Sequence, residues 1–223
     1  MNIDSIESAK KLDECLRKIP EIGPLHISLE EVWKVSENHP SGNRIFPSVL
    51  DIHLNVARLN IEIASIARRI NADMKEPTDL NCLTDPIDLK NRLDLFGDST
   101  AFVLRYRALW DKIMGVVVLL LDPKKYQNFC GAKSRKKCFC KFLENKGGSW
   151  PSYAKGVSET IQTFDDRFRT AEAHGSGRIR KMAFNRISSK SNPLEDLLWA
   201  TNSLNDQMLI FERIFKYLAE QGA

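Results

Sequence analysis

Apolar side chains recur every three or four residues along most of this chain, and no other sequence feature constrains its fold as strongly. The clearest run comprises Val49, Ile52, Val56, Leu59, Ile63, Ile66 and Ile70. A period near 3.6 residues places such side chains on one face of an α-helix. The strict alternation of apolar and polar residues that marks a half-buried strand is missing from the sequence. We therefore predict an all-α protein.

Prolines and capping residues indicate where the helices begin. Ser28 and Glu31 form a capping-box pattern, which predicts a short helix. Asp85-Pro86 predicts a helix that ends near Phe96, because Gly97-Asp98-Ser99 favours a kink or a break. We expect a helical bundle with shorter helices attached and four long core helices, which begin near Pro47, Ser99, Pro151 and Pro193.

The length of 223 residues suits one large domain, or one domain with an N-terminal extension. We predict a helical extension over residues 1–45 and a bundle domain over residues 46–223. Hydrophobic residues make up 43% of the chain and charged residues 28%, which is ordinary for a globular protein with a sizeable core.

The sequence favours a cytoplasmic protein with no membrane segment. The first eleven residues are polar and charged, and they lack the apolar core of a signal peptide. The longest apolar run covers Ile113 to Leu121 and is too short to span a bilayer. Five cysteines, an odd number, fit a reducing compartment.

Basic residues are concentrated in two segments of the second half of the chain. Residues 122–146 contain eight Lys or Arg against two acidic residues, and residues 167–190 contain seven against one. The net charge of the whole chain is only +4. This asymmetry favours a polyanionic partner such as RNA or a nucleotide, although a solvated basic face without a partner has the same pattern.

Arg169 and His174 are the candidate catalytic residues, at the end of the helix that Pro151 is predicted to open. Histidine is the side chain best suited to proton transfer near neutral pH. Arginine grips a phosphate with a planar fork of donors. The two together are sufficient for metal-free cleavage of a phosphodiester. The candidate substrate-binding residues nearby are Arg167, Arg178, Arg180 and Lys181.

The pairing within this motif is open. On an ideal helix Arg167 and His174 share a face, whereas Arg169 and His174 point about 140° apart. A pair between Arg169 and His174 therefore requires the helix to end near Ala173, or a second copy of the chain across a two-fold axis. His174 could instead only complement the dipole at the end of its helix.

A metal site is not expected. Cys130, Cys138 and Cys140 lack the paired spacing and the nearby histidine of a structural zinc site, so we interpret them as free thiols. The motifs of phosphate-binding loops, zinc proteases and serine hydrolases are also missing, and we expect no cofactor. Asp111 is interpreted as a surface residue or as a polar residue near a site.

An all-α bundle with Arg-x4-His, here Arg169 to His174, resembles the HEPN superfamily, the higher eukaryotes and prokaryotes nucleotide-binding domains. The resemblance in architecture covers roughly Pro47 to Leu218. It implies a metal-independent endoribonuclease that often works as a homodimer, with roles in defence, toxin–antitoxin systems or stress. Carried over to this chain, it makes His174 the proton-transfer group and Arg169 the residue that holds the scissile phosphate.

The chain departs from the family at two positions. Thr170 follows the motif arginine, where the family usually has Asn, Asp or His. Ser176 stands where toxins inactivated by nucleotidylation carry a tyrosine. Both departures fit a divergent member, with an antitoxin or a regulatory protein as a further expected partner. A non-catalytic module that binds RNA, a nucleotide or a protein is the alternative.

Overall fold

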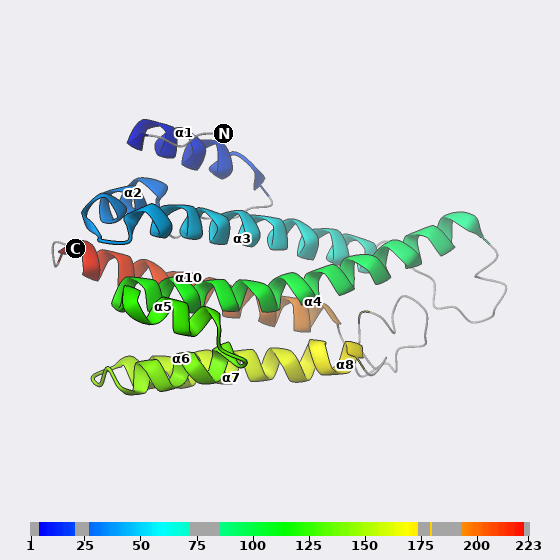
Figure 1. Cartoon of the computed structure of the whole chain (residues 1–223). Coiled ribbons are helices and arrows are strands. Elements are labelled where there is room, and N and C mark those ends of the chain that lie inside the picture. Colours follow the sequence, from blue (N-terminus) through cyan, green and yellow to red (C-terminus); the bar gives the residue numbers. More distant parts are fainter. Residues whose placement is uncertain (1–4, 21–26, 72–84, 174–178, 180–192, 221–223) are drawn as a thin grey trace.

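The computed structural model describes residues 5–20, 27–71, 85–173, 179 and 193–220. Every regular element in these ranges is helical, which confirms the predicted all-α class (Figure 1). The elements are α1 (Ile6–Arg17), α2 (Leu29–Asn38), α3 (Gly42–Asn71), α4 (Pro86–Leu121), α5 (Pro123–Cys130), α6 (Arg135–Glu144), α7 (Trp150–Phe164), the π-helical turn η3 (Asp165–Arg169), α8 (Thr170–Ala173) and α10 (Pro193–Glu220).

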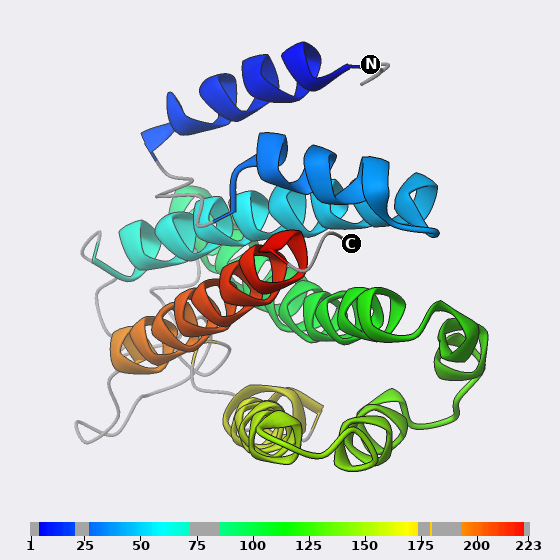
Figure 2. The same ribbon diagram turned by 90° about the vertical axis from the view of Figure 1, so that its left-hand side faces the viewer.

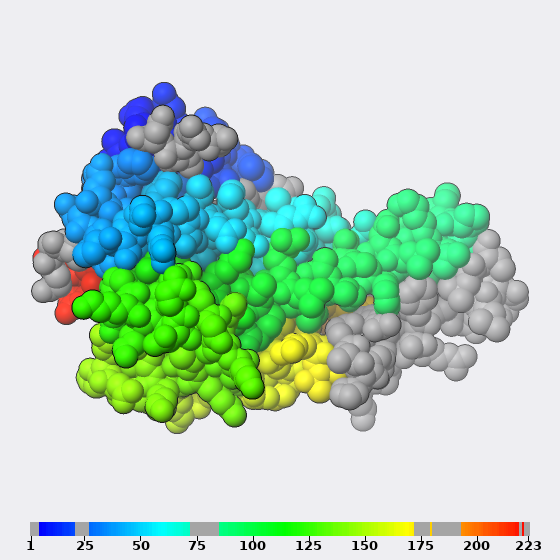
Figure 3. Space-filling view, in the orientation of Figure 1, coloured from blue at the N-terminus to red at the C-terminus, as the bar shows by residue number. Residues whose placement is uncertain are grey.

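The helices are arranged in layers around α4. α3 packs along α4, α2 packs on α3, and α1 covers α2 (Figures 1 and 2). On another side of α4, α6 packs against α7 and contacts α4 itself, and α10 packs against α2 and α3. Figure 3 shows these layers at the surface, with α2 and α3 above α4 and with α6 and α7 below it. The second half of α4 is therefore central to the bundle.

This central position explains the apolar end of α4. The core face predicted from the sequence is buried, which confirms Phe102, Tyr106, Leu109, Ile113, Val116 and Leu120. Val117, Val118 and Leu119 are buried as well, because α3, α5 and α6 all pack against this helix. A single copy of the chain thus buries these residues. Within the described residues, no helix is long and apolar enough to cross a membrane.

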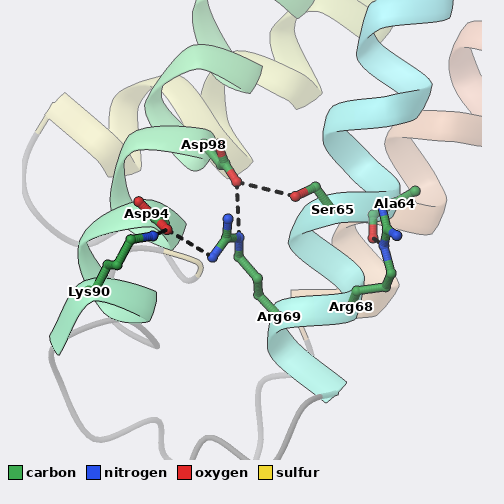
Figure 4. A network of polar contacts seen from close by, with 7 residues as sticks. All are labelled: Ala64, Ser65, Arg68, Arg69, Lys90, Asp94 and Asp98. Carbon is green, nitrogen blue, oxygen red and sulfur yellow. Dashed lines mark hydrogen bonds and ion pairs between the residues drawn. The ribbon is translucent and has the colours of Figure 1, made fainter. Parts of the chain in front are cut away.

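The predicted break at Gly97 is wrong, because α4 is one helix of 36 residues. Its predicted start is confirmed, since the side chain of Asp85 accepts a hydrogen bond from the Ile87 amide at 2.9 Å. A glycine inside a helix costs only about 1 kcal/mol relative to alanine. Contacts with α3 on both sides of Gly97 offset this cost: Arg69 lies 3.3 Å from a carboxylate oxygen of Asp94 and 3.3 Å from one of Asp98 (Figure 4).

These ion pairs give the stability a defined dependence on pH. A hydrogen bond from Lys90 is the main cause that holds the pKa of Asp94 below its usual value, and the charges of Lys90 and Arg69 act in the same direction. The pKa of a free aspartate in the unfolded chain is about 3.9. Because the folded-state pKa is lower, the ionised carboxylate stabilises the fold above the unfolded pKa, and this stabilisation is lost as the pH falls through the folded-state pKa. We expect wild type to be more stable than Asp94→Asn at about pH 6, and this difference to shrink towards about pH 2. Urea unfolding at several pH values in this range measures the free energy of unfolding of both proteins. A difference between them that does not change with pH contradicts the expectation.

The predicted start of the third helix at Pro47 is also wrong, because α3 begins at Gly42 and contains Pro47. The Ile45 amide donates to the Ser41 carbonyl at 3.1 Å, so the helical hydrogen bonds are established before the proline. Ile45 and Phe46 are buried and anchor this first turn. Proline near the start of a helix removes only one backbone hydrogen bond, and burial of the first turn outweighs this loss.

The N-terminal segment packs onto the same bundle. The capping box at Ser28 is confirmed: the Glu31 amide donates to the Ser28 hydroxyl at 3.1 Å, and the Ser28 amide donates to the Glu31 carboxylate at 3.4 Å. The ring of the buried His53 lies 2.9 Å from the carbonyl of Ile27 and so ties the start of α2 to α3. The proposed domain boundary between residues 45 and 46 lies within α3 and stays a prediction.

Candidate functional site

The structure describes two of the six predicted site residues. Arg167 and Arg169 lie in η3, at the end of α7. The other four lie outside the described residues: His174, Arg178, Arg180 and Lys181. The structure therefore shows the geometry of the two arginines of the motif. The predicted histidine, His174, directly follows Ala173, the last residue of α8.

The motif helix is not the single α-helix that the sequence predicted. A π-helical turn over Asp165–Arg169 separates α7 from α8. Phe164 and Phe168 are both buried, and their rings stack with centroids 4.9 Å apart. The π-turn ends at Arg169 and is followed by α-helical residues, so it leaves the expected angle of about 140° between Arg169 and His174 unchanged. The shared face expected for Arg167 and His174 assumed an ideal α-helix and does not apply across this wider turn. Single π-turns within α-helices occur frequently at functional sites.

Arg167 connects η3 to α10. One of its guanidinium nitrogens, Nη1, lies 3.2 Å from a carboxylate oxygen of Asp196, whose side chain is only 7% exposed. The guanidinium also lies over the ring of Trp199, at 4.8 Å from its centroid. A planar guanidinium suits both contacts. Arg167 therefore holds two helices together and is committed to a structural contact.

Arg169 is the more available of the two arginines. Its side chain is 61% exposed, and it forms an ion pair with Asp165 at 3.7 Å. This separation exceeds that of a hydrogen bond, so the pair is loose. A phosphate could form the bidentate hydrogen bonds that Asp165 does not.

Asp165 belongs to a charged cluster that joins η3 to α4 and α6. Arg107 lies 3.7 Å from Asp165 and donates a hydrogen bond of 2.7 Å to Asp111, and Arg135 lies 3.4 Å from Asp111. Together with Arg169, three guanidinium groups face two carboxylates, an excess of one positive charge. Sequence reasoning singled out Asp111 but did not place Arg107 and Arg135 beside it, because their meeting depends on how α4, α6 and η3 pack.

The described cysteines are free thiols, and the described histidines contact backbone carbonyls. Cys130, Cys138 and Cys140 are free thiols, and burial raises the pKa of Cys140. His53 is buried with both ring nitrogens 2.9 Å from backbone carbonyls, and His39 lies 3.3 Å from the carbonyl of Leu120. Among the residues that the structure describes, no cluster of three or more His, Cys, Asp or Glu side chains could hold a metal ion.

Comparisons of the chain with protein-family models, with functionally characterised proteins and with solved structures found no match.

Proposed function

We propose that this protein is a metal-independent endoribonuclease of the HEPN type, which cleaves RNA phosphodiesters through Arg169 and His174. The observation that carries this proposal is the exposure of Arg169 and its loose ion pair. Arg169 lies on a π-turn at the end of a core helix, its side chain is 61% exposed, and its contact with Asp165 is too long to be a hydrogen bond. Its guanidinium is therefore free to take a phosphate.

The chemistry follows from the two side chains. The ribose 2′-oxygen attacks the phosphorus atom, and the bond from phosphorus to the 5′-oxygen breaks. His174 takes the proton from the 2′-hydroxyl while water protonates the leaving 5′-oxygen, or water takes the first proton and His174 delivers the second. Arg169 donates hydrogen bonds to the phosphate and stabilises its growing negative charge. The products are a 2′,3′-cyclic phosphate and a 5′-hydroxyl.

The proposal also includes the surroundings of the motif. Arg178, Arg180 and Lys181 contribute positive charge that attracts the RNA backbone. Arg167 supports the site by fixing η3 to Asp196 of α10. The active form is a homodimer in which each copy supplies one Arg169–His174 pair, acting in the cytoplasm in defence, a toxin–antitoxin system or stress, with an antitoxin or a regulatory protein as partner.

The test is RNA cleavage in the presence of EDTA. We expect wild type to cut a mixed panel of structured and unstructured RNAs and to leave 2′,3′-cyclic phosphate ends. Removal of the proton-transfer group in His174→Ala should lower the rate by about 10²–10⁴-fold. Cleavage that requires a divalent metal, or that persists in His174→Ala, would contradict the proposal.

Thr170 favours one alternative, a non-catalytic module that binds RNA or a nucleotide with the same basic face. It departs from the residue types usual for catalytic members. This alternative predicts salt-dependent RNA binding without cleavage. Binding that weakens in Arg169→Ala, with no product formed by wild type, would support the module and overturn the nuclease.

A further inference from the structure

A cavity of about 860 Å³ lies between α7 and α10, away from the Arg167–Arg169 turn. Trp110 of α4 contributes to its wall, and Figure 2 shows α7 and α10 approaching α4 from different sides. Ligand pockets in proteins measure about 300–1,000 Å³, so this volume suits a small organic molecule. All the residues that line it belong to the described part of the chain.

The wall of this cavity offers flat apolar surface. Trp150 at the start of α7 and Tyr217 near the end of α10 both line it, together with the aliphatic Ile210. Ile210 and Tyr217 are seven positions apart on one face of α10, and both are unusually exposed for their type, at 36% and 55%. Aromatic walls of this kind favour a planar ligand.

Positive charge surrounds one part of the cavity. Arg213 lines it and has no carboxylate partner among the described residues, whereas the Lys146 ammonium donates to the carbonyl of Leu121 at 3.2 Å and lies 5.3 Å from the centroid of the Phe142 ring. Gly147 and Gly148, with φ of 69° and 58°, form the turn that leads to α7. Ser149 makes no side-chain cap for that helix, so the positive end of its dipole remains available. Asp206 is the acidic residue in the lining, which leaves one net positive charge.

A buried amide supplies a further polar contact. Gln207 is only 4% exposed, and its side-chain nitrogen donates to the hydroxyl of Tyr153. Trp110, in the same lining, is only 1% exposed, and its indole nitrogen Nε1 is buried with no hydrogen-bond partner among the described residues. A buried donor without a partner in the wall of a cavity points to a bound ligand.

We propose that this cavity binds a small organic anion with a planar apolar body. The planar part lies against Trp150 and Tyr217, and the anionic group lies between Arg213 and the start of α7. Gln207 or the Tyr153 hydroxyl orients the ligand by a hydrogen bond. Burial raises the pKa of Tyr153, which keeps its hydroxyl protonated. Phosphate esters and carboxylates of aromatic molecules share this chemistry, and the site does not depend on Arg169.

Tryptophan fluorescence of the full chain, checked by calorimetry, tests the proposal, because Trp110 and Trp150 line the cavity. The probes are adenosine 5′-monophosphate, indole-3-acetate and, as a neutral counterpart, adenosine. We expect saturable binding of at least one anion, at least about tenfold tighter than that of adenosine, with Arg213→Ala removing this preference. Tighter binding of adenosine 5′-monophosphate would identify the ligand as a phosphate ester, and tighter binding of indole-3-acetate would identify it as a carboxylate. No saturable binding of either anion, or equal binding of adenosine, overturns the proposal.

Gly156 offers a variant that fills the cavity without disturbing the fold. It lines the cavity in the middle of α7, and a Cβ atom built there meets no other atom within 4 Å. Gly156→Leu should abolish binding while thermal stability is kept. The matched control is Gly97→Leu, an equally open helical glycine in α4 that does not line the cavity, and it should bind like wild type. Binding that survives in Gly156→Leu places the ligand elsewhere and overturns the assignment.

Discussion

Arg169→Ala is expected to lower the rate of RNA cleavage by about 10²–10³-fold, the effect of removing one donor that stabilises developing charge in a transition state. The free energy of unfolding should change by less than about 0.5 kcal/mol, because the side chain is 61% exposed and its contact with Asp165 is loose. Single-turnover cleavage in EDTA measures the first effect, and urea unfolding measures the second.

Arg167→Ala is the matched control for this expectation. It removes the contact with Asp196 and the stacking over Trp199, so it should cost about 1–2 kcal/mol of stability and leave most of the cleavage activity. Arg169→Lys keeps the charge but loses the planar fork, and should recover only part of the rate. A full loss of activity in Arg167→Ala, with Arg169→Ala unaffected, would assign the phosphate contact to Arg167.

Gly42→Ala is expected to destabilise the protein by about 3 kcal/mol, the upper end of the usual cost of overpacking. A Cβ atom on Gly42 would lie 1.7 Å from the backbone oxygen of Ser36, at the tight connection between α2 and α3. A backbone oxygen cannot move aside as a flexible side chain can, so α2 would have to shift. Urea unfolding of the variant and of wild type under the same conditions measures the cost.

Gly97→Ala provides the control, because it places the same methyl group on another helical glycine. A Cβ at Gly97 meets nothing within 4 Å, so this variant should gain about 0.5–1 kcal/mol from better helix propensity. The two variants are therefore expected to change stability in opposite directions. If the free energy of unfolding of Gly42→Ala lies within about 0.5 kcal/mol of the wild-type value, the close approach of the Ser36 oxygen is not the reason why this position requires glycine.

Local physical chemistry explains which features the sequence predicted well. The capping box at Ser28 and the start of α4 at Asp85 depend on hydrogen bonds within one helical turn. The buried face of α4, from Phe102 to Leu120, follows from the helical period alone. The choice of Arg169 and His174 as a candidate site is likewise a matter of side-chain chemistry, and their catalytic role stays a prediction.

The sequence by itself thus determined the all-α class, most helix starts and the side chains available for chemistry, because each of these depends on residues close together in the chain. Only the tertiary structure decided that α4 continues through Gly97, since Arg69 of another helix pairs with residues on both sides of that glycine. The tertiary structure also decided that Arg167 is anchored and Arg169 is exposed, because Arg167 contacts Asp196 and Trp199, which come from α10. The cavity has the same origin: its walls lie about fifty residues apart in the chain and meet only through packing around α4.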